Sequence, residues 1–191
     1  ASMTAVRMDG KALAAKVPSG GQLIPNPYKK WSDIDPALPD KKIEVLGPPP
    51  TSGTRDAFLE LVMEPGAAKF PMLADLKKAD AKAYTAAAHT VREDGAYVDA
   101  GENDNVIVGK LASNPGAFGV FGFSFLDQNA DRLQGSIVDT VAPEFQAIAD
   151  GKYAASRPLY IYVKKQHVGV IPGLAEYVAE YTSEKAWGKR G

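Results

Sequence analysis

The chain of 191 residues contains no cysteine, which excludes a disulfide framework, a metal site built on thiolates and a cysteine nucleophile. It also lacks an excess of charge of either sign, because 22 Lys and Arg residues stand against 23 Asp and Glu residues. No apolar run approaches the roughly 20 residues that span a bilayer, and the first residues lack the basic and then apolar pattern of a secretory signal. We therefore expect local recognition of a small molecule, and no nucleic acid or membrane as partner.

Strand-like and helix-like patterns alternate along the chain. This alternation predicts an α/β fold of three layers, a mixed sheet flanked by helices. The expected helices cover residues 9–17, 56–63, 70–91, 103–113, 143–151 and 171–188, and the expected strands cover residues 41–47, 118–125 and 157–165. The last of these strands, "RPLYIYVKK", is apolar at consecutive positions, which predicts a strand that is buried on both faces.

The stretch "PPPTSGTR", residues 48–55, predicts an anion site at a helix start. If Ser52 is the N-cap, then Gly53, Thr54 and Arg55 form the first turn, and their amides have no partner within the helix. The helix dipole adds positive charge there, the glycine allows close approach, and the hydroxyl groups of Thr51, Ser52 and Thr54 supply further donors. A tetrahedral oxyanion fits this set of donors.

Arg55 breaks the local rule, because a cation in the first turn of a helix opposes the dipole. A capping box would place Glu or Gln three residues after Ser52. A bound phosphate would satisfy the dipole and the guanidinium together. The alternative is that Ser52 is an ordinary cap and Arg55 points to solvent or toward Asp56, and the sequence leaves both interpretations open.

Motifs for catalysis and metal binding do not emerge from the sequence. The helix start lacks the Gly-Lys-Ser/Thr ending of a nucleotide loop and the Gly-x-Ser-x-Gly pattern of a hydrolase. His89 and His167 have no flanking motif that would make them bases, and "ENDN" lacks the spacing of a calcium loop. We therefore expect no enzyme activity, no catalytic residue, no metal and no cofactor.

Three stretches together resemble a known family: "EVLGPPPTSGTRDAF", "REDGAYVDAGENDNVIVGKLASNPGAFGVFGFSFL" and "EFQAIADGKYAASRPLYIYV". The chain resembles the phosphate-binding proteins of high-affinity phosphate ABC transporters, which are periplasmic binding proteins with two lobes. The resemblance implies that Ser52, Gly53 and Thr54 bind inorganic phosphate. It implies Arg92 as the main cationic ligand, with Arg55 second.

The chain departs from this family in two respects. Some relatives carry an arginine and an acidic residue four and two positions before the serine, where this chain has Pro48 and Pro50. Family members also begin with another lobe, which nothing here matches. The resemblance therefore implies a single α/β lobe over residues 1–191, the second of two, in which residues from about 155 to 191 return toward the missing first lobe.

The resemblance also implies partners and a compartment. We expect a mature periplasmic protein, without a signal peptide in this chain, that works with an ABC transporter permease. The exposed face between the lobes could form a homodimer or a swapped assembly. Two other hypotheses remain open: a protein-interaction fragment with a vestigial anion site, and an enzyme that uses Ser52 on phosphorylated substrates.

Overall fold

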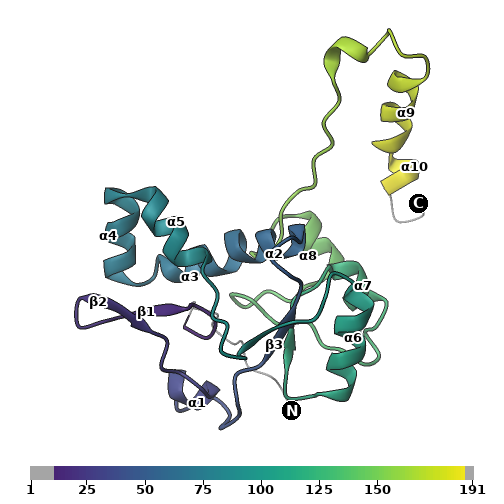
Figure 1. The fold of residues 1–191 in the computed structure, drawn as a ribbon. Helices are drawn as coiled ribbons and strands as arrows, with labels where there is room; N and C mark the ends of the chain where they lie inside the picture. Colours follow the sequence, from purple (N-terminus) through teal and green to yellow (C-terminus); the bar gives the residue numbers. More distant parts are fainter. Residues whose placement is uncertain (1–10, 188–191) are drawn as a thin grey trace. The chain divides into compact units, whose positions relative to one another are not determined.

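The computed structural model describes residues 11–187, and the chain divides at Arg157 and Pro158 into two compact units. Each unit is described by itself (Figure 1). The first unit contains β1 (Lys16–Ser19), β2 (Gln22–Pro25), α1 (Trp31–Ile34), β3 (Val45–Gly47), α2 (Gly53–Phe58), η1 (Leu59–Met63), α3 (Glu64–Ala67), α4 (Pro71–Ala79), α5 (Ala81–His89), β4 (Tyr97–Asp99), α6 (Asp104–Ser113), β5 (Phe118–Gly119), α7 (Phe123–Asp127) and α8 (Phe145–Ala149). The second contains η2 (Lys165–His167), α9 (Leu174–Tyr181) and α10 (Glu184–Trp187).

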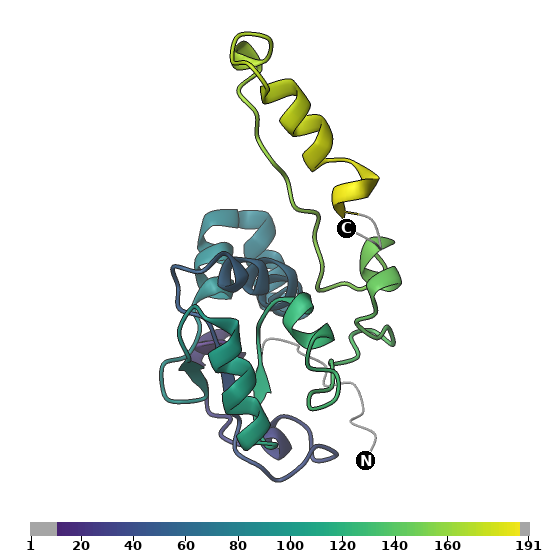
Figure 2. The ribbon, with the colours of Figure 1, turned by 90° about the vertical axis from the view of Figure 1, so that its right-hand side faces the viewer.

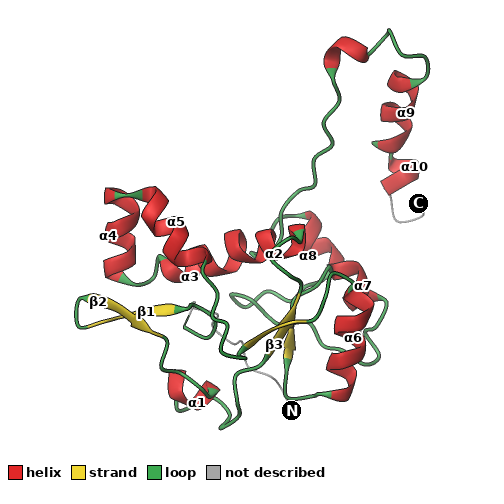
Figure 3. Ribbon diagram, in the orientation of Figure 1, coloured by secondary structure: helices red, strands yellow, loops and turns green. Residues whose placement is uncertain are grey.

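The central sheet of the first unit has three parallel strands in the order β4-β3-β5. A separate antiparallel hairpin is formed by β1 and β2 (Figure 3). The α/β class and the flanking helices predicted from the sequence are confirmed. The described strands of this sheet are all parallel, whereas we expected a mixed sheet. The antiparallel pair of β1 and β2 lies outside it.

Successive residues of β3 serve the two faces of this sheet, because side chains alternate along a strand. Val45 is fully buried in a cluster with Phe58 and Met63 from the α2–η1 segment and Trp31 from α1. Leu46 packs on the opposite face in a cluster that contains Ile107 of α6, and Figure 2 brings α6 to the front. The arrangement is therefore three layers, with helices on both faces of the sheet.

The helix that follows β3 runs without a break from Gly53 through α2, η1 and α3 to Ala67. Its middle segment, η1, is π-helical and ends at Met63, directly before Glu64 and Pro65. Proline has no amide hydrogen for the carbonyl four residues earlier, so the widened turn accommodates Pro65 within a helical path. The predicted helix over residues 56–63 is confirmed within this longer run.

A second cluster of buried side chains lies beyond this helix. Tyr84 of α5 is fully buried with Leu73 of α4 and Ala67 of α3, and its hydroxyl donates to the carbonyl of Glu64 at 2.5 Å. The predicted helical region over residues 70–91 is confirmed as two helices, since Asp80 ends α4 and caps α5 by accepting from Ala83 N at 2.9 Å.

The start of the described chain contradicts one sequence prediction. A helix was expected over residues 9–17, of which 9 and 10 lie outside the described residues. Residues 16–19 instead form β1, because Gly20 and Gly21 take positive φ values of 56° and 80° and turn the chain into the hairpin with β2. Paired glycines in this conformation fit the two-residue turn that hairpins favour. Pairing across this two-residue turn thus overrides helix propensity.

The two predicted strands near the other end also need correction. The expected strand over residues 118–125 is β5 at Phe118–Gly119 only, and residues 123–127 form α7. The expected buried strand over residues 157–165 has no strand partner within the described residues. Leu159 and Tyr162 in this segment are 85% and 93% exposed. The apolar pattern predicts burial correctly only where a partner surface is present.

Candidate anion-binding site

The Ser52 helix start lies at the carboxyl end of the central strand. β3 ends at Gly47, and residues 48–52 connect it to α2. The neighbouring strand β4 leads into α6 in the same way, and β5 leads into α7. Because β4 and β5 lie on opposite sides of β3, the chain switches sides at this strand, and such switch points are where open parallel sheets bind ligands.

Ser52 is the N-cap of α2, as predicted. Its backbone is extended, with φ −86° and ψ 133°, and its Oγ accepts a hydrogen bond of 3.2 Å from the amide of Thr54. The hydroxyl hydrogen of Ser52 is not used in this bond, so it can be donated to a ligand. This capping bond also means that the Thr54 amide, which we expected to be available, is already engaged within the helix start.

The amides of Gly53 and Arg55 are the donors that remain at this end of the helix. Neither has a hydrogen-bond acceptor among residues 11–187, whereas the amide of Asp56 is the first to bond within the helix, to the carbonyl of Ser52 at 3.1 Å. Gly53 is exposed, and a Cβ placed on it would meet no atom within 4 Å. A ligand can therefore approach the main chain directly at Gly53.

The Arg55 side chain is the most unusual group at the site. Only 8% of the residue is exposed, and its Nε and Nη1 atoms are buried without a hydrogen-bond partner among the described residues. A buried donor without a partner costs about 1–3 kcal/mol, and a charged donor costs more. The expectation that Arg55 points to solvent is therefore wrong, and the guanidinium has donors to spare for an anion.

Tyr97 holds the other side of this guanidinium. The Arg55 Cζ lies 4.0 Å from the centre of the Tyr97 ring, and the phenol donates to the carbonyl of Pro48 at 2.7 Å. Burial raises the pKa of the Tyr97 phenol above its ordinary value, and the nearby charge of Arg55 opposes this rise. No sequence pattern indicates this contact, because the two residues lie on different elements far apart in the chain.

Arg92 is also buried, but its donors are largely committed. Its Nε and Nη2 donate to the two carboxylate oxygens of Asp94 at 2.7 and 2.5 Å, and Nη1 donates to the carbonyls of Tyr28 and Ala12. The Arg92 guanidinium holds the pKa of the Asp94 carboxyl well below its usual range. Four of the five N–H groups of an arginine are thus used. Arg92 stays a predicted ligand, but the structure favours Arg55 over it.

Thr51 links the helix start to the next loop. Its hydroxyl donates to the carboxylate of Glu102 at 2.7 Å, and Glu102 directly precedes Asn103, which caps α6 by accepting from Asn105 N at 3.0 Å. The two strand-to-helix loops therefore lie side by side at this edge of the sheet. The Thr51 hydroxyl, which we expected as a further donor to the anion, has this carboxylate as its partner.

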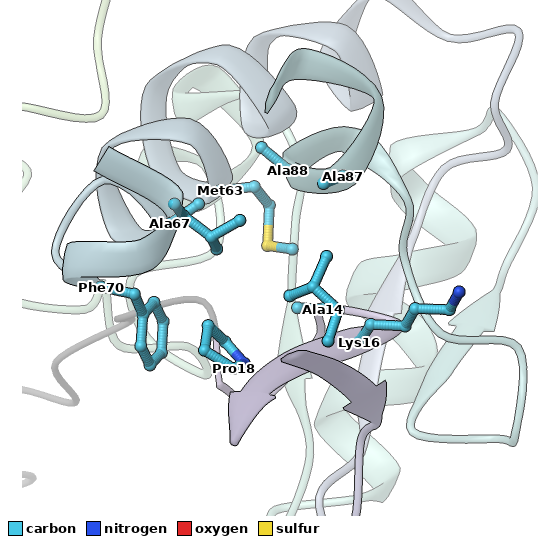
Figure 4. Close-up of a pocket in the computed structure, with 10 residues that line it drawn as sticks. Ala14, Lys16, Pro18, Met63, Ala67, Phe70, Ala87 and Ala88 are labelled. Atoms are coloured by element: carbon cyan, nitrogen blue, oxygen red, sulfur yellow. The ribbon is translucent and has the colours of Figure 1, made fainter. Parts of the chain in front are cut away.

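Other parts of the described chain offer less. A cavity of about 10 Å³, the size of one water, lies between the hairpin and α3–α5. It is lined by alanines and by Met63 and Phe70, with the Lys16 amine directed away (Figure 4). His89 Nε2 lies 3.1 Å from Oε1 of the Glu64 carboxylate. Within the described ranges, no cluster of metal-binding side chains occurs, and no helix combines the length and hydrophobicity that crossing a bilayer requires.

Comparison with known proteins places this chain in a family. Residues 10–185 match the family model described as a PBP superfamily domain. The chain belongs to the PBP superfamily. Among curated proteins of this kind, a phosphate-binding protein PstS from Staphylococcus haemolyticus is 34% identical over 143 residues. Another from Staphylococcus saprophyticus is 30% identical over 162 residues. The resemblance drawn from the three stretches of sequence is thereby confirmed.

Solved structures of the PBP type agree with this assignment. The crystal structure of "a possible phosphate binding protein" from Planctomyces limnophilus has a TM-score of 0.58 and 26% identity, and covers 94% of this chain and 53% of that one. PstS from Borrelia burgdorferi, at 19% identity, shares the fold with a TM-score of 0.56. The chain spans less than half the length of the curated relatives: 42% of the Staphylococcus saprophyticus protein, which matches 82% of this chain, and 36% of the Staphylococcus haemolyticus protein, which matches 72%.

Proposed function

We propose that this chain binds inorganic phosphate at the Ser52–Arg55 helix start, as part of the substrate-binding component of a phosphate ABC transporter. The observation that carries this proposal is the buried Arg55 guanidinium, whose Nε and Nη1 have no partner among residues 11–187. The names of the relatives from Staphylococcus, which are phosphate-binding proteins, support the same ligand. The protein acts as a receptor without breaking a bond.

The donors at the helix start suit a tetrahedral anion. The amides of Gly53 and Arg55 and the hydroxyls of Ser52 and Thr54 are neutral donors from one turn of backbone, and the Arg55 guanidinium adds a full positive charge. Phosphate offers four oxygens and a negative charge to such a set, so it satisfies donors that otherwise stay buried and unpaired.

Phosphate binding to this chain is tested by thermal unfolding with and without phosphate. Because a ligand that binds only the folded state stabilises it, phosphate at 100 times its dissociation constant adds about 2.7 kcal/mol. For a chain of this size, that free energy raises the Tm by roughly 5–10 °C. An unchanged Tm at 50 mM phosphate contradicts the proposal, and competition with sulfate shows which oxyanion the site prefers.

The serine-enzyme hypothesis finds no support at this site. The Ser52 hydroxyl oxygen accepts from a backbone amide, and His89 is engaged with the Glu64 carboxylate. A nucleophile needs a base within hydrogen-bond reach. Incubation with generic phosphoesters tests the enzyme hypothesis directly. Turnover by the wild type that is lost in Ser52→Ala would show an enzyme and contradict the receptor function.

We also propose that residues from about 155 to 191 pack against a further lobe of the whole protein. The greater length of the relatives leaves room for such a lobe. The exposed apolar side chains of the second unit support this proposal: Leu159, Tyr160, Ile161, Tyr162, Val163, Val168, Val170, Ile171 and Tyr177 are all at least 36% exposed. Many large apolar side chains exposed in one segment favour an interaction site. The mature protein would then act in the periplasm with a membrane permease.

Limited proteolysis tests the packing of this segment. Chymotrypsin should cleave the isolated chain rapidly after Tyr160 or Tyr162, because the backbone around them lies outside helices and sheet ladders. Fusion to the part of the Staphylococcus saprophyticus relative that this chain does not match should slow both cleavages. Equal cleavage rates in the fusion contradict the proposed packing. If the isolated chain instead protects these sites as its concentration rises, the apolar face joins copies of the chain in a homodimer or swapped assembly.

A further inference from the structure

We propose that Tyr97 is the positioning residue of the anion site, and that it holds the Arg55 guanidinium at the helix start while Gly47 leaves the space that its ring needs. This inference rests on the proposed function, and it concerns a residue that the sequence analysis did not single out. Three contacts around the Tyr97 ring carry it.

The first contact fixes the guanidinium. Arg55 Cζ lies 4.0 Å from the centre of the Tyr97 ring, and a cation over the face of an aromatic ring is attracted by the ring's negative face. This contact holds Arg55 in place while its Nε and Nη1 have no hydrogen-bond partner among the described residues. A carboxylate partner would consume these donors.

The comparison with Arg92 shows what the alternative looks like. Arg92 is just as buried, but its guanidinium is held by the Asp94 carboxylate and two carbonyls, and four of its N–H groups are used. A neutral ring thus immobilises one arginine without neutralising it, and an acid immobilises the other and neutralises it. Only the first arrangement keeps a full charge for an incoming anion.

The second and third contacts fix the ring itself. The Tyr97 hydroxyl donates to the carbonyl of Pro48 at 2.7 Å, which ties the ring to the loop that leads to the helix start. A Cβ on Gly47 would lie 2.7 Å from Cζ of Tyr97, closer than two carbons can approach. Gly47 is therefore required for the ring to lie over this point of β3, and the Arg55 guanidinium contacts this same ring.

Phosphate affinity of the full chain tests the proposal by isothermal titration with inorganic phosphate. Tyr97→Leu should weaken binding about tenfold, because it removes a desolvated cation–π contact of about 2 kcal/mol at most and frees the guanidinium. Tyr97→Phe keeps the ring and should retain affinity within about threefold. The control is Tyr84→Leu, which removes another buried tyrosine under a lysine amine, with Lys77 Nζ 5.0 Å from its ring centre; it should lower stability and leave affinity unchanged.

A second readout does not depend on phosphate. An immobilised arginine gives a sharp Nε–H resonance that exchanges slowly with water, and the Arg55 signal is assigned by its loss in Arg55→Lys. In ligand-free protein this signal should persist in Tyr97→Phe and disappear in Tyr97→Leu. If Tyr97 only filled space, the Arg55 signal would persist in both variants.

The combined outcomes separate the two proposals. If the wild type binds phosphate and Tyr97→Leu binds it equally well, the positioning role is overturned and the proposed function stands. If the wild type binds no phosphate, the proposed function fails, and the resonance decides alone: loss of the signal in Tyr97→Leu supports the hold on Arg55, and its persistence overturns it.

Discussion

Replacing Arg55 with methionine should make the ligand-free protein more stable and abolish phosphate binding. Arg55 buries two nitrogens without a partner among the described residues, which at about 2 kcal/mol each destabilise the fold by about 4 kcal/mol. The contact between the Arg55 guanidinium and the Tyr97 ring offsets about 2 kcal/mol of this destabilisation. Methionine fills similar volume without polar donors, so Arg55→Met should raise the free energy of unfolding by about 2 kcal/mol and the Tm by about 4–8 °C.

The assay is thermal and urea unfolding of wild type and Arg55→Met in phosphate-free and sulfate-free buffer, repeated with phosphate. The wild type should gain stability from phosphate and the variant should not. Arg92→Met is the matched control, since Arg92 is an equally buried arginine whose donors are satisfied. Arg92→Met leaves the carbonyls of Tyr28 and Ala12 and the Asp94 carboxylate without their donor, and should lower stability by about 1–3 kcal/mol. The two arginine replacements therefore shift stability in opposite directions.

A lower Tm for Arg55→Met in phosphate-free buffer would refute the reasoning. It would mean that the Arg55 nitrogens have partners in the folded protein, and that this arginine stabilises the fold as Arg92 does. A residue that weakens the empty protein and strengthens the occupied one is expected at a binding site, where local strain is retained for function.

Three further predictions concern the cap, an ion pair and the apolar segment. Ser52→Ala should lower the free energy of unfolding by about 1 kcal/mol through loss of the cap and should weaken phosphate binding in titration calorimetry, whereas equal affinity would exclude its hydroxyl as a ligand. Asp94→Asn should lower stability by about 1–2 kcal/mol at pH 7, a small value because the carboxylate is 38% exposed. Because the Asp94 pKa is depressed in the folded state, this difference from wild type should hold above about pH 4 and shrink as pH falls toward 2 in urea unfolding; a constant gap contradicts the ion pair. Tyr162→Asp should reduce concentration-dependent association in sedimentation velocity, and unchanged association would place the contact elsewhere.

Local features of the site were predictable from the sequence. Ser52 as the cap of α2 and Asn103 as the cap of α6 follow from rules that involve only a few neighbouring residues. The long helical region over residues 70–91 follows from alanine propensity, and its division at Asp80 follows from capping. These elements are decided within one or two turns of chain, so a sequence pattern contains the necessary information.

Features that depend on distant contacts were not predictable. The burial of Arg55 on α2 depends on Tyr97, which lies on strand β4, and the commitment of Arg92 depends on carbonyls 64 and 80 residues away. The apolar residues 159–163 remain exposed for the same physical reason, since burial requires a surface to pack against and sequence periodicity does not provide one.

A crystal structure of the chain at saturating phosphate tests the central claim most directly. The account predicts a tetrahedral peak at the start of α2, within hydrogen-bond distance of the Gly53 amide, the Ser52 hydroxyl and the Arg55 guanidinium. Water alone at this position, with the Arg55 nitrogens still lacking a partner, would contradict it.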